Sequence, residues 1–193
     1  MGKLFYIMGK SASGKDTIYQ RLLRNPEFSL ERLVIYTTRP IRDGELDGRE
    51  YHFVTEEDFQ KLKAEGKIIE DRGYETVYGL WRYFTADNMN LEEKSYLGIG
   101  TLESYEKLKA YYGEEKIRPI YIEVEDGERL KRAIAREETQ ETPKYEEMCR
   151  RFLADAQDFS EEKIRQAGIS HRFSNMDGAG CYSEIEKYLR SVL

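Results

Sequence analysis

Apolar residues along the chain fall into short runs that alternate with amphipathic segments. Four runs have the length and composition of buried strands: residues 4–8 (LFYIM), 33–38 (LVIYTT), 96–100 (YLGIG) and 119–124 (PIYIEV). Helical patterns separate these runs, and strands separated by helices form parallel sheets with right-handed crossovers. We therefore expect an α/β fold in which helices cover both faces of a parallel sheet.

The amphipathic segments carry recognisable helix boundaries. Residues 55–66 (TEEDFQKLKAEG) offer Thr55 as an N-cap, carry acids in the first turn and end at a glycine, and residues 101–113 repeat this pattern. Residues 127–168 are helical in character almost throughout, with an interruption around Pro143. Residues 183–193 predict a closing amphipathic helix.

The alternation of strand and helix patterns stops between residues 39 and 82. There, turns connect short strand patterns and one helical pattern. This predicts a small mixed α/β insertion that lies over the carboxyl edge of the sheet. We expect a single domain of 193 residues. Its predicted parts are a core (residues 1–35, 93–128 and 167–193), an insertion (36–92) and a helical region (129–166).

Composition narrows the class of protein. No run approaches the roughly 18 apolar residues of a membrane span, and the apolar start is too short for a signal peptide, so we expect a cytoplasmic protein. The net charge of −6 argues against a general nucleic-acid binder. Cys149 and Cys181 have no metal-ligand spacing, which predicts two reduced thiols. The sequence does not indicate an oligomeric state.

Residues 9–17 (GKSASGKDT) match the phosphate-loop pattern G-x-x-x-x-G-K-[ST] except at one position. Asp16 stands where a hydroxyl residue is expected, and Thr17 follows it. The flanking strand and helix give the context that the motif requires, so backbone N–H groups and Lys15 are predicted to hold nucleotide phosphates. The candidate ATP-binding residues are Gly9, Ser11, Ala12, Ser13, Gly14, Lys15, Asp16 and Thr17.

Asp16 needs an explanation because an unpaired carboxylate beside a triphosphate would repel it. Three arrangements avoid this repulsion: a helix cap, an ion pair with a nearby base, or a bond to Mg²⁺. We favour the third, with Thr17 as a second candidate ligand of the metal. The sequence thus predicts ATP and Mg²⁺ as cofactors.

Residues 37–54 (TTRPIRDGELDGREYHFV) resemble the acceptor segment of the guanylate kinase family, and the resemblance extends over nearly the whole chain. It implies that Arg39, Arg42 and Tyr51 grip the phosphate of the acceptor nucleotide and that Glu45 orients them. Guanidinium forks suit this task because they pair with two phosphate oxygens at once. Tyr78, in a matching Y-G pair, is implied to touch the same phosphate.

The same resemblance assigns the remaining candidates. Glu70 matches the glutamate with which the family reads guanine, and Asn175 in FSNMD corresponds to the segment that packs against the donor adenine. Residues 129–166 resemble the family's helical lid. The lid arginines implied by the resemblance are Arg132, Arg136 and Arg151.

Four positions depart from the family pattern. Ile35 and Leu80 replace hydroxyl residues, and Gly98 and Gly100 replace an acidic strand end. The chain therefore keeps the residues implied to bind the acceptor phosphate but lacks most of those implied to recognise the base.

The expected activity is phosphoryl transfer from MgATP to a nucleoside monophosphate, with GMP as the expected acceptor. The expected catalytic residues are Lys15, Arg39, Arg136 and Arg151. Two alternatives stay open: a kinase of another phosphorylated acceptor, such as another monophosphate or a ribose bisphosphate, and an interaction module without catalysis. Small-molecule nucleotides are the expected partners.

Overall fold

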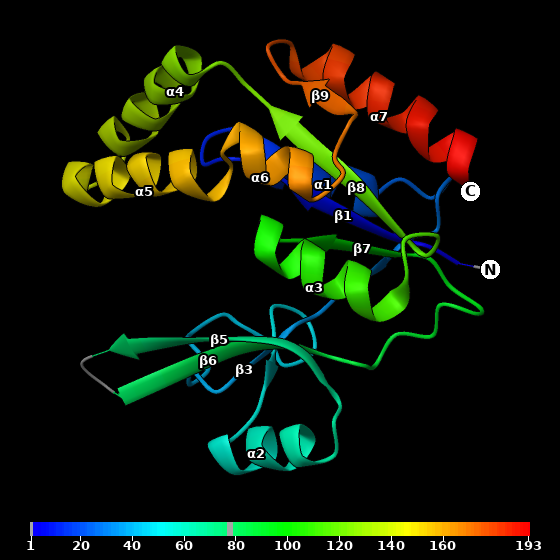
Figure 1. The fold of residues 1–193 in the computed structure, drawn as a ribbon. Coiled ribbons are helices and arrows are strands. Elements are labelled where there is room, and N and C mark those ends of the chain that lie inside the picture. The colour runs from blue at the N-terminus through cyan, green and yellow to red at the C-terminus, as the bar shows by residue number, and fades with distance from the viewer. Residues whose placement is uncertain (1, 77–78) are drawn as a thin grey trace.

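A wholly parallel sheet of five strands, in the order β2-β7-β1-β8-β9, forms the centre of the molecule. The computed structural model describes residues 2–76 and 79–193 (Figure 1). The strands are β1 (Leu4–Met8), β2 (Glu31–Arg32), β7 (Tyr96–Ile99), β8 (Ile117–Glu123) and β9 (Arg172–Ser174). The predicted parallel α/β sheet is confirmed.

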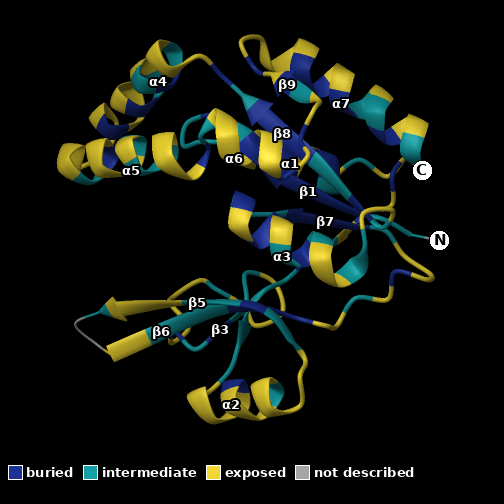
Figure 2. Ribbon diagram, viewed as in Figure 1, coloured by how far each residue is buried: buried dark blue, intermediate teal, exposed yellow. Residues whose placement is uncertain are grey.

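Helices cover both faces of this sheet because alternate residues of β1 point to opposite sides. Leu4, Tyr6 and Met8 join one buried cluster, which includes side chains of α3 (Leu102–Tyr112) and α6 (Glu161–Gln166). Phe5 and Ile7 join the other cluster, with α1 (Lys15–Leu23) and α7 (Gly178–Val192). Figure 2 shows the resulting core, with buried strands enclosed between half-exposed helices.

The insertion forms a second, mixed sheet in the order β4-β3-β6-β5. Its strands are β3 (Tyr36–Thr37), β4 (His52–Phe53), β5 (Ile68–Thr76) and β6 (Gly79–Ala86), and it carries α2 (Glu56–Ala64). Phe59 of α2 packs edge-on against Phe84 of β6, with ring centroids 5.0 Å apart, in a small separate core. Figure 1 places α3 between this insertion and the central sheet.

The predicted N-caps of α2 and α3 are confirmed. The Thr55 hydroxyl accepts the backbone N–H of Asp58, whose carboxylate in turn accepts the N–H of Thr55, a capping box. The Thr101 hydroxyl accepts the N–H of Ser104 at 3.2 Å.

The prediction of one strand over residues 33–38 is wrong. The chain leaves the central sheet after Leu33, whose N–H donates to Leu97, and enters the second sheet at Tyr36. The apolar run therefore bridges two sheets, which a hydropathy pattern alone does not reveal. The sequence also did not predict the short strand β9, and α7 begins at Gly178, earlier than expected.

The predicted helical region contains α4 (Asp126–Glu138), α5 (Tyr145–Asp158) and α6, with a break around Pro143. One face of α4 is buried at every fourth residue, namely at Arg129, Ala133 and Glu137. Ile164 of α6 is buried in the central core, so core packing extends into the range predicted as the lid. Among the described helices, none has the length and apolar character required to cross a membrane.

Candidate active site

The loop after β1 has the backbone of a phosphate cradle. Ala12 and Gly14 adopt positive φ angles of 61° and 81°, which curl the chain at the start of α1. A Cβ at Gly14 would lie 2.5 Å from the Asn175 Nδ2, so glycine is needed both for the conformation and for the close approach. No side chain caps α1, which leaves the N–H groups of its first turn available to an anion.

Lys15 and Asp16 begin α1 and lie beside each other. The Lys15 Nζ is 3.6 Å from the Asp16 Oδ2, and the side chains are 21% and 83% exposed, respectively. Asp16 thus points to solvent in a helix first turn, where a negative charge is favourable. Of the arrangements considered for Asp16, the ion pair is present, whereas the helix cap is not, because no side chain caps α1.

The described residues contain no group of three or more acidic, histidine or cysteine side chains that could hold a metal ion. A Mg²⁺ ion commonly takes only one or two protein ligands when it also binds substrate phosphates. The Asp16 carboxylate and the Thr17 hydroxyl, both hard oxygen donors at the loop, fit that mode of binding.

A pocket of about 240 Å³ lies beside the loop and α1. Asn175 connects the pocket to the loop: its Nδ2 donates to the Ser13 carbonyl at 2.7 Å, while its Oδ1 is buried without a hydrogen-bond partner in the described chain. The pocket brings together four predicted residues, namely Gly14, Thr17, Arg132 and Asn175. Its lining residues are Gly14, Thr17, Ile18, Arg21, Arg132, Asn175, Gly178 and Tyr182.

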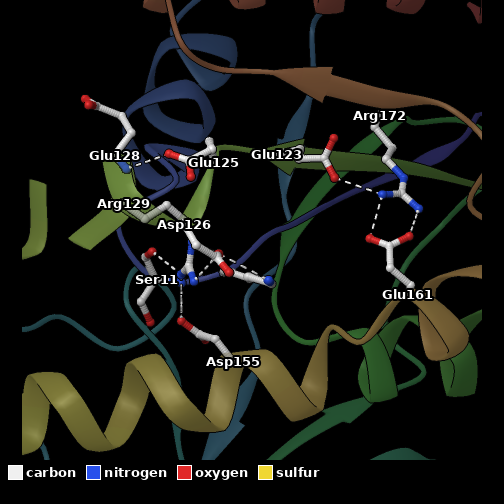
Figure 3. A network of polar contacts seen from close by, with 10 residues as sticks. Ser11, Glu123, Glu125, Asp126, Glu128, Arg129, Asp155, Glu161 and Arg172 are labelled. Atoms are coloured by element: carbon white, nitrogen blue, oxygen red, sulfur yellow. Dashed lines mark hydrogen bonds and ion pairs between the residues drawn. The ribbon is translucent and has the colours of Figure 1, made fainter. Parts of the chain in front are cut away.

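A buried arginine ties the loop to the helical region (Figure 3). Arg129, whose side chain is 1% exposed, donates to the Ser11 carbonyl at 2.9 Å and to the carboxylates of Asp126 and Asp155. Asp155 also accepts the Ser11 N–H at 2.7 Å. The sequence analysis missed this network; the spacing of Arg129 with Ala133 and Glu137 is the signal that could have indicated it.

The acceptor segment folds around an ion pair. Arg39 is 3% exposed, and both its terminal nitrogens donate to the Glu45 carboxylate, at 2.8 and 3.0 Å. The Arg42 N–H donates to the same carboxylate at 2.8 Å. The hydrogen bond from Arg39 holds the pKa of Glu45 below its ordinary value, and the same bond raises the pKa of Arg39. Glu45 therefore contacts both Arg39 and Arg42.

A cavity of about 620 Å³ lies between the insertion, the end of β7 and α5. Two predicted residues, Tyr51 and Arg151, line it, and the Tyr51 ring lies 5.5 Å from the buried Arg39 guanidinium. Tyr78 falls outside the described residues. The full lining comprises Ile35, Tyr51, Arg72, Tyr74, Trp81, Tyr83, Ile99, Gly100, Glu147 and Arg151.

This cavity and the phosphate loop lie at adjacent strand ends. β1 and β7 are parallel neighbours in register at Ile7 and Ile99, and the Gly100 N–H donates to the Ile7 carbonyl at 3.1 Å. The loop follows β1, while Ile99 and Gly100 line the cavity at the end of β7. Ligands of open α/β sheets bind at such carboxyl ends.

The predicted lid arginines are mostly exposed. The Arg151 Nε donates to Glu147 at 3.0 Å, and this side chain is 55% exposed at the cavity. Arg136 is 52% exposed, 3.9 Å from Glu137, and is absent from the cavity lining among the described residues. Arg132 pairs with Glu128 on its own helix.

Glu70, the predicted base reader, is buried on β5. It is 3% exposed and accepts a hydrogen bond from the Thr85 hydroxyl at 2.8 Å. Its other oxygen lies 3.4 Å from the Ser104 Oγ and 3.2 Å from the Arg72 Nε. The sequence analysis missed Arg72, although its place two residues after Glu70 on a strand puts both on one face.

Comparisons with known proteins agree with this architecture. The family model described as "Guanylate kinase" matches residues 1–164. The guanylate kinase of Porphyromonas gingivalis is 30% identical over 198 residues, which cover 100% of this chain and 99% of that relative. The guanylate kinase of Schizosaccharomyces pombe is 40% identical over 101 residues, 52% of this chain, and that of Vibrio parahaemolyticus is 36% identical over 99 residues, 51% of this chain. In these two alignments the chain spans less than half of the relative's own length, 44% and 45%.

A crystal structure of guanylate kinase from Anaplasma phagocytophilum has the same fold. The two structures match with a TM-score of 0.65 over 98% of this chain and 85% of the other, at 23% sequence identity.

Proposed function

Because the chain belongs to the guanylate kinase family, we propose that it transfers the γ-phosphoryl group of ATP to the phosphate of a nucleoside monophosphate. GMP is the acceptor that the family resemblance favours. The observation that carries the proposal is the pairing of a phosphate loop, at the end of β1, with an acceptor cavity at the end of the neighbouring strand β7.

The donor half of the site suits ATP. The curled backbone of residues 9–14 and the uncapped start of α1 provide N–H groups for phosphate oxygens, and Lys15 adds a positive charge where negative charge accumulates during transfer. The pocket beside the loop would take the adenine. There the Asn175 side chain, which bonds the Ser13 carbonyl, would lie against the base. Asp16 and Thr17 would hold Mg²⁺, which supplies charge neutralisation at the phosphates.

The acceptor half suits a phosphate monoester. Arg42 and Tyr51 would bind the acceptor phosphate, and Glu45 would hold the buried Arg39, whose guanidinium lies 5.5 Å from the Tyr51 ring. An acceptor oxygen then attacks the γ-phosphorus in line while the bond to the ADP oxygen breaks. Positioning and charge stabilisation supply most of the rate in such reactions, and no covalent intermediate is needed.

The helices α4 and α5 would close over the transferring group. Arg151 lines the cavity from α5, and Arg136 would approach from α4 on closure. Closure excludes water and so limits hydrolysis of ATP.

A non-catalytic role is disfavoured by the phosphate loop, since Gly14 and Lys15 serve no purpose in a module that binds no nucleotide. A different phosphorylated acceptor is favoured by one observation: Glu70 is enclosed by Thr85, Ser104 and Arg72 rather than open to the cavity.

A coupled ADP-release assay tests the proposal. With MgATP and a panel of monophosphates, we expect ADP release that depends on the acceptor and falls by orders of magnitude in Lys15→Ala, because that variant lacks the charge aimed at the phosphates. Equal rates with and without every acceptor, or equal rates for Lys15→Ala and wild type, would contradict it.

A further inference from the structure

Where β5 lines the acceptor cavity, the exposed charged group is the guanidinium of Arg72 and not the carboxylate of Glu70. Arg72 lines the cavity, while Glu70, two residues earlier on β5, contacts Arg72 and is absent from the lining among the described residues. The Arg72 side chain is 21% exposed and that of Glu70 is 1% exposed. Arg72 therefore separates Glu70 from a ligand in the cavity.

The oxygens of Glu70 are already engaged. Oε1 accepts the Thr85 hydroxyl, and Oε2 has the Ser104 hydroxyl and the Arg72 guanidinium as neighbours. If Glu70 turned to bind a base, the two hydroxyls and the guanidinium would lose their acceptor. Leaving buried polar groups without a partner is costly. Glu70 thus acts as the anchor of Arg72.

Arg72 has donors without acceptors. Its Nε is buried and forms the ion pair with Glu70 at 3.2 Å, so a ligand can meet only the terminal nitrogens, which donate no hydrogen bond in the described part of the chain. Arginine has five N–H donors and no acceptor. A ligand at this end of the cavity must therefore supply lone pairs.

The end of β7 supplies no acidic group to offset this charge. A Cβ at Gly98 would lie 2.6 Å from the Tyr6 ring, and a Cβ at Gly100 would lie 2.1 Å from the Tyr6 hydroxyl. Tyr6 is 2% exposed, so it occupies the space that an acidic side chain would need. The carboxylate in the described lining is Glu147, which accepts hydrogen bonds from Arg151 and Arg150.

We propose that Arg72, rather than Glu70, reads the acceptor base, and that it selects bases with a keto oxygen. An arginine fork matches the O6 and N7 acceptors of a 6-oxopurine, whereas adenine places an amino donor beside N7. The rings of Tyr74, Trp81 and Tyr83 line the same cavity and suit a planar base. This inference rests on the proposed function and deepens it, since it names the substrate class of the same site.

A distinctive consequence concerns the 2-amino group of guanine. A free carboxylate at Glu70 would accept from that group and from the ring N–H, so it would favour GMP over IMP. With Glu70 covered by Arg72, the 2-amino group is not read. IMP, which lacks it, should therefore be as good an acceptor as GMP.

The test compares GMP, IMP and AMP in two ways: kcat/KM from ADP release, and acceptor affinity from calorimetry in the presence of a non-hydrolysable ATP analogue. For the wild type we expect GMP and IMP to agree within about threefold, since no group contacts the amine. AMP should be worse by about 5- to 150-fold, the range for loss of a bidentate base contact.

Two variants separate Arg72 from Glu70. Arg72→Met should remove the preference for GMP over AMP and, by uncovering Glu70, create a preference for GMP over IMP. Arg72→Lys keeps the charge that pairs with Glu70, so it should fold as the wild type does and lose only part of the preference for GMP over AMP. Arg190→Met on α7, whose partner is Glu27, is the matched control and should keep all wild-type ratios.

Failure of the role of Arg72 and failure of the proposed kinase activity give different results. A wild-type preference for GMP over IMP above about tenfold, equal use of GMP and AMP, or wild-type ratios in Arg72→Met and Arg72→Lys would overturn the proposal. Absence of turnover with every monophosphate would refute the proposed kinase activity, whereas the calorimetric affinities would still decide the role of Arg72. Failure of both GMP and IMP to bind would overturn this inference as well.

Discussion

Replacement of Arg129 by methionine tests whether the phosphate loop depends on the helical region. Arg129 is 1% exposed and donates to Ser11, Asp126 and Asp155. Removal of one partner of a buried ion pair lowers stability by about 3–5 kcal/mol. Because the Asp155 and Asp126 side chains are 14% and 55% exposed, we take the lower end, about 3 kcal/mol. At about 2–4 °C per kcal/mol for a chain of this size, Tm should fall by about 6–12 °C.

The assay is thermal unfolding of Arg129→Met beside Arg190→Met. The control removes an ion pair of comparable geometry on the surface, where Arg190 and Glu27 are 48% and 46% exposed and water weakens their attraction, so its removal should change Tm little. Because Ser11 belongs to the loop, Arg129→Met should also raise the KM for ATP, and Arg190→Met should not. Equal Tm shifts for the two variants, or an unchanged KM for ATP in Arg129→Met, would refute this reasoning.

Four further predictions follow from single features of the molecule. Glu45→Gln should raise the KM for the acceptor about tenfold, since it weakens a charged hydrogen bond to Arg39, and leave the KM for ATP unchanged; the reverse pattern in steady-state kinetics would contradict the assignment. Gly100→Ala should lower the free energy of unfolding by about 1–3 kcal/mol through its clash with the Tyr6 hydroxyl, and Tyr6→Phe in the same chain should restore part of the loss in denaturant titrations. Burial raises the pKa of several tyrosines to about 12, so the stability they contribute is full below pH 10 and is lost as pH rises toward 12; a Tm that stays constant between pH 9 and pH 11 would disagree. If Asp16 helps to hold Mg²⁺, Asp16→Ala should need more Mg²⁺ at fixed ATP than Asp16→Ser, and identical titration curves would limit Asp16 to its place in the first helical turn.

Much of the fold follows from local patterns in the sequence. The apolar runs that became β1, β7 and β8, and the caps at Thr55 and Thr101, are set by residues close in the chain. The run at residues 33–38 was misinterpreted because its two ends pair with different sheets, a choice that depends on partners far away in sequence.

In the candidate site, too, some features are set by residues close in the chain and others by residues far apart in it. The phosphate loop and the Arg39–Glu45 pair lie within short segments, so motif spacing reveals them. The network of Arg129 joins Ser11 to Asp155 across more than one hundred residues, and the enclosure of Glu70 requires Ser104 from α3. Such contacts arise only from tertiary packing.

Phosphorus NMR of the reaction mixture tests the central claim most directly, because it identifies the group to which the γ-phosphoryl is transferred. With MgATP, GMP and the wild-type protein, the account predicts coupled signals of a nucleoside diphosphate formed from the acceptor together with ADP. The same sample with Lys15→Ala should show ATP and acceptor unchanged. Signals of inorganic phosphate and ADP with the acceptor monophosphate intact would contradict the account.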